Sequence, residues 1–180
     1  LEAKKFSKID KDWGKVMAKA ASTAVVVPCC ANELLKNSLP IMYAELERCQ
    51  KSLEGYLEQK RNRFPRFYFV SNSVLLQVLS RGSDPFQMQE YYEKLFDSVS
   101  RVVHDDADKN KIVGLQHIKG DDVEDIPLRN PVNVFGNIED WLLRLQLSMQ
   151  DTMKEICSNV QEEATLDIDV PTREFIDRYP

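Results

Sequence analysis

Residues 51–85, KSLEGYLEQKRNRFPRFYFVSNSVLLQVLSRGSDP, contain the break between helices around which the rest of the chain is organised. A helical pattern stops at Phe64, because a residue that precedes proline is disfavoured in helical dihedral angles. The aromatic run at 66–70 has a strong preference for β structure, and we expect it to be strand-like. Ser71 then predicts the N-cap of a second helix, which ends near Gly82. The stretch predicts a stiff joint between two helices and shows no catalytic pattern.

This structural joint is assigned to six residues: Phe64, Pro65, Arg66, Phe67, Tyr68 and Phe69. We expect its aromatic side chains to fix the angle between the helix before them and the helix after them. Basic residues accompany the rings, namely Lys60, Arg61, Arg63 and Arg66. Such a mixture can suit single-stranded nucleic acid, where bases stack on rings. We favour a basic helix end that complements the helix dipole, followed by core aromatic residues, because the chain is acidic overall.

Upstream of the joint, the spacing of the apolar residues predicts helices. Asp10 is a candidate cap for a short helix that contains Trp13, and residues 25–28 are expected to form an irregular connection. Asn32 is a candidate cap for a longer helix, which Pro40 is expected to interrupt or restart. The apolar residues of this helix repeat as in a helix–helix seam: Met42, Leu46, Cys49, Leu53 and Tyr56. Three heptads are too few for a long coiled coil and predict one helix of a bundle.

Downstream of the joint, Pro85 is suited to the first turn of a helix whose apolar stripe runs from Met88 to Val102. Residues 112–118 and 123–134 are predicted as two strands around a short loop that contains Gly120. Two prolines, Pro127 and Pro131, confine the second strand to a sheet edge or break it up. A last long helix is predicted from Asn137 onward, and residues 171–180 are expected to form a short helical turn.

The fold class predicted from these elements is mainly α: an elongated helical bundle or rod with one small β-hairpin insertion. Residues 1–110 form its helical part, residues 111–135 the β-hairpin insertion, and residues 136–180 the long helix and a connection to the next part of the polypeptide. No internal repeat is visible. The sequence begins without Met or a charged-then-apolar leader, and we expect it to be excised from a longer polypeptide.

Composition restricts the classes of function. With 43% hydrophobic and 29% charged residues among 180, the chain is typical of a globular protein with a real core. Its net charge of −5 argues against a nucleic-acid partner, because phosphate binding needs clustered Lys and Arg. The longest apolar run, residues 24–30, is far shorter than the roughly 20 residues that cross a bilayer, so no membrane partner is predicted.

Candidate chemistry is sparse. The four cysteines, Cys29, Cys30, Cys49 and Cys157, are expected to be free and mostly buried thiols in a reducing cytosol. They form no C-x-x-C pair, and no metal site is predicted. Residues 106–110 resemble the start of a calcium loop, but Lys111 and His117 occupy the positions that need Gly and Glu, so a solvated acidic loop is predicted. Phosphate-binding and nucleophile motifs are missing, so we predict no catalytic residue, no cofactor and no enzymatic activity of this chain itself.

Five segments, whose order along the chain matches that in a known family, carry a resemblance to it. Residues 56–71 match the block YLE-x-KR-x-x-FPRFYF-x-S, and LL-x-x-LS and D-P follow. Residues 6–13 match F-x-x-(I/V)-D-x-x-W, and residues 136–142 match G-x-(V/I)-E-x-W-L. The run CCANELL at 29–35 and the end of the chain at 173–180 complete the set. The chain resembles the linker region of dynein heavy chains, in its C-terminal part just before the first AAA+ module, and the axonemal outer-arm type is most similar.

The resemblance implies a non-catalytic lever, whose residues 136–180 would include the connection to the motor ring. In the family, the linker arches over the AAA+ ring and bends or straightens with nucleotide state, which drives the stroke on microtubules. The implied partners are the AAA+ ring of the same heavy chain and, through an ATP-driven parent chain, other dynein subunits and microtubules in a ciliary or flagellar axoneme. Lys119, Gly120 and Asp121 are implied as a possible ring contact, although the hairpin sequence departs from the serine–acidic–glycine–acidic pattern of many heavy chains.

A second interpretation of the residues is a free-standing helical interaction scaffold. In that case the seam between Met42 and Tyr56 would bind a partner helix. Both interpretations predict a helical bundle, so they differ in function and not in fold.

Overall fold

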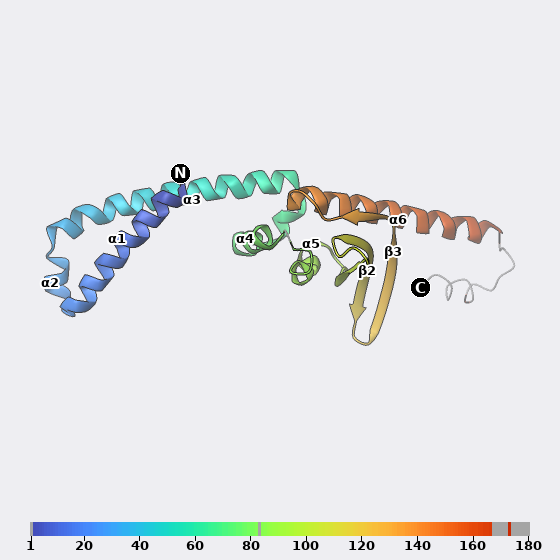
Figure 1. Cartoon of the computed structure of the whole chain (residues 1–180), viewed down its shortest axis with the longest axis horizontal. Coiled ribbons are helices and arrows are strands. Elements are labelled where there is room, and N and C mark those ends of the chain that lie inside the picture. The colour runs from blue at the N-terminus through green and yellow to red at the C-terminus, as the bar shows by residue number, and fades with distance from the viewer. Residues whose placement is uncertain (1, 83, 167–172, 174–180) are drawn as a thin grey trace. The chain divides into compact units, whose positions relative to one another are not determined.

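The computed structural model describes residues 2–82, 84–166 and 173 (Figure 1). Helices account for most of these residues, and a small antiparallel sheet is the β component, so the mainly α prediction is confirmed. The chain divides into two compact units, Leu1–Gln59 and Lys60–Pro180. The helical turn predicted at 171–180 and the resemblance at 173–180 lie outside the described residues, apart from Arg173.

The first unit contains α1 (Glu2–Thr23), α2 (Val26–Cys30) and most of α3 (Glu33–Arg63). Helix α1 begins well before Asp10, because Phe6 and Ile9 continue the helical spacing of the apolar residues toward the N-terminus. Ala24 has a φ of 53° and ends α1. The predicted cap of α3 is present, since the Leu34 N–H donates to Asn32 Oδ1 at 3.1 Å.

Two prolines in this unit are helical, contrary to expectation. Pro28 lies in α2, where an irregular connection was predicted, and Pro40 lies inside a continuous α3. Pro28 is tolerated because the N–H groups of a first helical turn have no intrahelical acceptor. At Pro40 one hydrogen bond is lost from a helix of 31 residues, and the turns on either side maintain it.

The second unit begins with the end of α3 and continues through η1 (Pro65–Phe69), α4 (Asn72–Arg81), η2 (Gln89–Tyr91) and α5 (Tyr92–Leu95). The sheet follows, with β1 (Arg101–His104), β2 (Lys111–Lys119) and β3 (Asp122–Asn133) in that spatial order. Helix α6 (Ile138–Leu166) closes the described part. The core is built from fully buried side chains of η1, α4, α5, β2, α6 and two connecting residues: Phe64, Phe67, Leu75, Val78, Met88, Tyr92, Ile112, Trp141, Leu142 and Leu145.

Two predictions for this unit were wrong. The aromatic run at 66–70 forms a 3-10 helix and not a strand, with Phe67 N–H bonded to Phe64 O at 3.0 Å. Pro65 fixes φ near −65°, which favours a tight turn over the β preference of the rings. The helix expected from Pro85 to Val102 is present only as η2 and α5, because residues 85–88 form turns and α5 ends at Leu95; the β-branched residues beyond it supply β1. The sheet therefore has three strands where a two-stranded hairpin was predicted.

The predicted hairpin itself is present, and its second strand lies at a sheet edge. Along β2, Ile112 pairs with Val132 but Gly114 pairs with Pro127, so residues 128–131 of β3 bulge out opposite one residue. Pro127 lies just before this bulge, and Pro131 is its last residue.

Helix α6 covers the bulge with two hydroxyl groups, and Figure 1 shows this helix running beside β3. Arg129 N–H donates to Thr152 Oγ1 at 3.1 Å, and Ser148 Oγ donates to Asn130 O at 2.5 Å. Side chains of α6 thus satisfy backbone groups that a neighbouring strand would otherwise pair, which protects the edge.

Candidate functional site

The six joint residues divide into a buried set and an exposed set. Phe64 and Phe67 are fully buried, and their rings meet edge to face with centroids 5.0 Å apart. Phe96, just after α5, adds a third ring 6.1 Å from Phe64. Tyr68 and Phe69 are 53% and 71% exposed. The structure therefore brings Phe64 and Phe67 together in the core and leaves Tyr68 and Phe69 at the surface.

Arg66 connects three elements from the middle of η1. Its Nε donates to Gln146 Oε1 of α6 at 3.2 Å, and its Nη1 donates to the carbonyl oxygen of Leu95 at 3.0 Å. The guanidinium also lies over the Phe96 ring, 4.9 Å from its centroid. A planar group with five donors can make these contacts at once, which lysine cannot do.

Arg61, in the last turn of α3, holds the other side of η1. Its side chain donates to the carbonyl oxygens of Phe67 and Val70, both at 3.4 Å, and to Asn72 Oδ1 at 2.7 Å. The first two acceptors are carbonyls of η1 and of the residue that follows it, and the third belongs to the start of α4. Arg61 therefore fixes the path of the chain from α3 into α4.

A buried carboxylate lies where α3 ends and α6 begins. Glu139 is fully buried, and its Oε1 is 2.6 Å from Lys60 Nζ and 3.4 Å from an Nη of Arg63. Its Oε2 has no hydrogen-bond partner among the described residues. A buried charge is tolerated only when it is paired. The Lys60 side chain is only 18% exposed, whereas Arg63 is 61% exposed. Lys60 is therefore the partner that matters energetically.

Glu139 was not assigned a role from the sequence. Lys60 and Arg63 were interpreted as the basic end of a helix, and nothing local shows that a carboxylate 79 residues away contacts Lys60. The available signal was the placement of an acidic residue next to Ile138 and Trp141 in the first turn of α6, where an anion also complements the helix dipole.

The end of α4 packs against the start of α6 beside this ion pair. Trp141 Nε1 donates to the carbonyl oxygen of Gly82 at 3.4 Å. A Cβ built on Gly82 would lie 2.3 Å from Ile138 Cδ1, so the two helices approach closely only because residue 82 has no side chain. We call the region formed by the end of α3, η1, the end of α4 and the start of α6 the joint cluster.

The joint cluster lacks the groups that catalysis needs. It contains cation–carboxylate pairs, rings and an indole, but no nucleophile beside a base. Within the described ranges, no group of three or more His, Cys, Asp or Glu side chains could hold a metal ion. What the arrangement can do is resist rotation of one helix against another, because packed interiors change between discrete arrangements and deform little.

Perturbed titration occurs away from the joint cluster. Burial lowers the pKa of His104 below its ordinary value, although the Lys109 backbone and Asp84 act in the opposite direction. The imidazole stacks on Phe86 with centroids 4.5 Å apart and lies 3.4 Å from Gln89 Nε2. The Gln89 amide also bonds both backbone groups of Val102 and so closes the outer edge of β1. This site stabilises the sheet and has no catalytic geometry.

The three residues assigned to a possible ring contact form the tip of the β2–β3 hairpin. Lys119 pairs with Asp122, and Gly120 and Asp121 are the two loop residues between them. Gly120 has a φ of 64°, which a tight hairpin turn requires and glycine adopts without strain. Lys119, Gly120 and Asp121 are all exposed. In Figure 1 the tip lies at the end of the sheet away from α6.

The predicted seam of α3 is only partly covered. Leu46, Leu53 and Tyr56 are exposed, while Met42 and Cys49 are half-buried. Phe6 of α1 joins Leu46, Cys49 and Leu53 along an apolar groove in the first unit. All four cysteines are free, as predicted, but none is buried. The expectation of mostly buried thiols was wrong, since Cys29 and Cys49 are half-buried and Cys30 and Cys157 are exposed.

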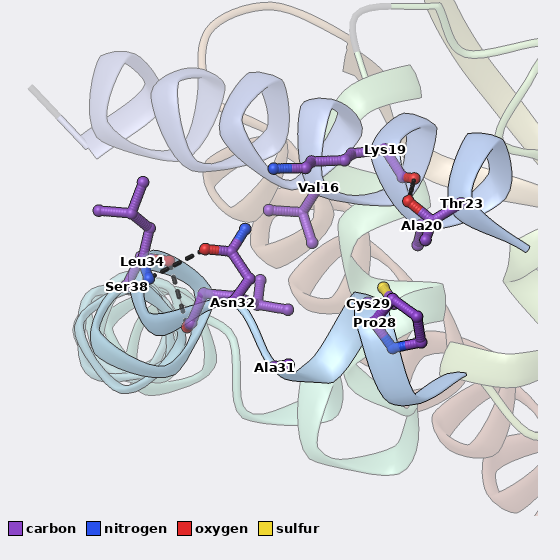
Figure 2. A pocket seen from close by; sticks show the side chains of 11 residues that line it. Val16, Lys19, Ala20, Thr23, Pro28, Cys29, Ala31, Asn32, Leu34 and Ser38 are labelled. Carbon is purple, nitrogen blue, oxygen red and sulfur yellow. Dashed lines mark hydrogen bonds between the residues drawn. The ribbon is translucent and has the colours of Figure 1, made fainter. Parts of the chain in front are cut away.

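A hollow of about 250 Å³ lies in the first unit between the end of α1, α2 and the start of α3 (Figure 2). Three of its polar side chains, Thr23, Asn32 and Ser38, are already engaged with backbone. Thr23 Oγ1 donates to Lys19 O at 2.9 Å, Asn32 caps α3, and Ser38 Oγ donates to Leu35 O at 3.3 Å. The hollow offers no convergent set of free polar groups for a ligand.

No helix in the described part of the chain has both the length and the apolar character that a membrane span needs.

Comparison with known proteins gives a consistent family. Residues 1–160 match the family model described as dynein heavy chain, N-terminal region 2. The chain is 38% identical to dynein axonemal heavy chain 5 of Rattus norvegicus over 99% of its length. It is 39% identical to the dynein gamma chain, flagellar outer arm, of Chlamydomonas reinhardtii, again over 99%. Cytoplasmic dynein 2 heavy chain 1 of Caenorhabditis elegans is 32% identical over 91% of this chain. The chain spans only 4–5% of the length of these relatives.

Proposed function

The chain belongs to the dynein heavy chain family, and from that premise we propose that it is a mechanical linker segment of such a motor. It would act as a lever that transmits nucleotide-driven changes of an AAA+ ring into a power stroke on microtubules, without catalytic activity of its own. The parent chain would be an ATP-driven microtubule motor. Its partners would be the AAA+ ring of the same heavy chain and, through the parent chain, other dynein subunits and microtubules.

The names of the relatives support an axonemal location for this motor. Of the three relatives described above, one is named as an axonemal chain and one as a flagellar outer-arm chain. We infer that the parent chain is an axonemal dynein heavy chain of the outer-arm type, located in the axoneme of a cilium or flagellum.

The observation that carries the lever proposal is the joint cluster. A lever transmits force only if its segments keep their angles under load. The joint cluster opposes bending with two buried rings, the Arg66 contacts to α5 and α6, and the buried Lys60–Glu139 pair. These contacts break together when one helix rotates, so the cluster supports transmission of force from the end of α3 to α6.

The exposed hairpin tip supports a second element of the proposal. Lys119, Gly120 and Asp121 are free of the packed core, and the sheet behind them is anchored to α6 through the bulge. A rigidly mounted tip is suited to touching the AAA+ ring in one nucleotide state. Deleting Gly120 and Asp121 in the complete motor would then alter motility or microtubule-stimulated ATPase activity, and an unaltered motor would contradict the contact.

The lever proposal is tested by separating movement from chemistry. In a complete heavy chain, Phe67→Ala is expected to slow microtubule gliding while a substantial microtubule-stimulated ATPase rate remains. The ring would still hydrolyse ATP, but the weakened joint would bend under load. Phe69→Ala, which changes an exposed ring two residues away, is the matched control and should leave gliding unchanged. Equal loss of gliding and ATPase in Phe67→Ala would contradict a purely mechanical role.

A helix-binding scaffold is the second candidate, and the exposed seam residues Leu46 and Leu53 favour it. Their replacement by Gln would abolish capture of a partner helix but would leave the joint cluster intact. A motor in which these replacements have no effect on assembly or movement would remove this candidate.

A further inference from the structure

Helix α1 carries an uninterrupted row of positive charge. Five of its lysines recur with spacings of four, three, four and four residues: Lys4, Lys8, Lys11, Lys15 and Lys19. At about 100° per residue they fall within an arc of roughly 80°, and at 1.5 Å per residue they span about 22 Å. We call these five residues the basic stripe. All of them are exposed.

Among the described residues, few ion pairs neutralise the basic stripe. Lys15 contacts Asp12 at 3.0 Å with both side chains exposed, which is a weak interaction. The other four lysines make no ion pair with any residue that the structure describes. Lys19 lies extended along α1 toward its N-terminus (Figure 2). This row of charge stands out because the whole chain carries −5.

The surface beside the basic stripe is formed largely by small side chains. Four of its lysines line a shallow depression together with Ala3, Ser7 and Asp12. Gly14 lies farther along the same side, and a Cβ placed there would meet nothing within 4 Å. Side chains this small allow the backbone of another helix to approach α1 closely, with the lysines at its flank.

Three classes of acidic partner fit a row of lysines, and the surroundings separate them. Nucleic acid is disfavoured because α1 has no arginine for bidentate phosphate contacts, and its rings Phe6 and Trp13 lie on the opposite side of the helix from the lysines. An anionic membrane is disfavoured because Ala3, Ser7 and Gly14 beside the lysines offer no large apolar group to insert.

We propose that the basic stripe docks an acidic α-helix of a protein partner. Its Asp or Glu side chains would recur with spacings of three and four residues over about four turns, which matches the length of the basic stripe. Charge complementarity would align the two helices, and the small side chains would set their close approach.

The test uses the 180-residue chain and a labelled, alanine-based peptide whose glutamates follow the spacing of the basic stripe. A scrambled peptide of the same composition, a 20-nucleotide single strand and phosphatidylserine vesicles are the competing probes. Binding is measured by fluorescence anisotropy or co-sedimentation between 50 and 200 mM salt. The patterned peptide is expected to bind more tightly than every other probe, and its binding should weaken with salt.

Charge-reversal variants assign the binding to α1. K4E/K8E/K11E should weaken binding of the patterned peptide about tenfold or more, because three attractions become repulsions. K36E/K51E/K154E makes the same change of net charge at exposed lysines elsewhere and should have little effect. If circular dichroism shows that the first variant loses helix, K4Q/K8Q/K11Q replaces it.

Several outcomes would overturn the proposal. These are no measurable binding of the patterned peptide, equal binding of the scrambled peptide, tighter binding of the nucleic acid or the vesicles, and equal losses in the two triple variants. The last result would show that net charge alone governs the interaction.

Discussion

Replacing Phe67 by Ala removes a fully buried ring that meets Phe64 edge to face at 5.0 Å. Burial of this kind makes Phe→Ala cost about 3–5 kcal/mol, from lost transfer free energy and the cavity that remains. The edge-to-face contact adds to that loss. Phe69 carries the same ring two residues later but is 71% exposed, so its truncation is expected to change the free energy of unfolding by no more than about 0.5 kcal/mol.

The measurement is urea unfolding of the 180-residue chain and of both variants, followed by far-ultraviolet circular dichroism and by tryptophan fluorescence. Trp141 lies in the same core as Phe67, so its fluorescence reports on the second unit, whereas Trp13 lies in the first. At unchanged m-value of about 1–3 kcal/mol/M, a loss of 3–5 kcal/mol shifts the midpoint by about 1–5 M urea. Equal midpoints for Phe67→Ala and Phe69→Ala would refute the assignment of Phe67 to the core that stabilises the second unit.

Three further predictions concern the joint cluster and the sheet. Glu139→Gln removes the buried carboxylate that lies 2.6 Å from Lys60 Nζ and should destabilise the second unit by about 3–5 kcal/mol in chemical unfolding, whereas Glu139→Gln with Lys60→Met should recover much of that loss. Gly82→Ala forces a Cβ against Ile138 Cδ1 and should lower the free energy of unfolding by about 1–3 kcal/mol, with partial relief from Ile138→Ala. Equal stability of wild type and Gly82→Ala would contradict the close approach of α4 and α6. Burial lowers the pKa of His104, so the unfolded chain binds more protons at this site than the folded chain does. The free energy of unfolding should therefore fall as pH drops below about 6.5, and it should fall less in His104→Gln. Parallel pH profiles of stability for the two proteins would contradict this.

Local rules predicted the elements that depend on local chemistry. Pro65 ends the helical pattern, Ser71 caps α4 by accepting from Val74 N–H at 3.4 Å, and the hairpin turns at Gly120. Each of these follows from the preference of one residue type for one backbone conformation. Such preferences act over a few residues and need no knowledge of the rest of the fold.

The errors arose where two local preferences competed or where the partner was distant. At 66–70 the β preference of three rings opposed the fixed φ of Pro65, and no neighbouring strand was available to favour the extended form. Strand β1 was missed because the apolar residues from Met88 to Val102 recur with a helical period. The β-branched residues at the end of that segment favour a strand instead. The Lys60–Glu139 pair joins residues 79 apart, and a single sequence gives no sign of such pairing.

The bulge in β3 has a practical consequence for placing reporters in this molecule. Thr152 and Ser148 hold the hairpin at residues 129 and 130, so its mounting does not depend on the length of the loop at the far end. A fluorophore or small tag inserted between Gly120 and Asp121 should therefore leave strand register intact, because exposed loop tips accept insertions well. If the proposed lever function holds, such a label in a complete motor would move with α6 and report any rotation of that helix during ATP hydrolysis.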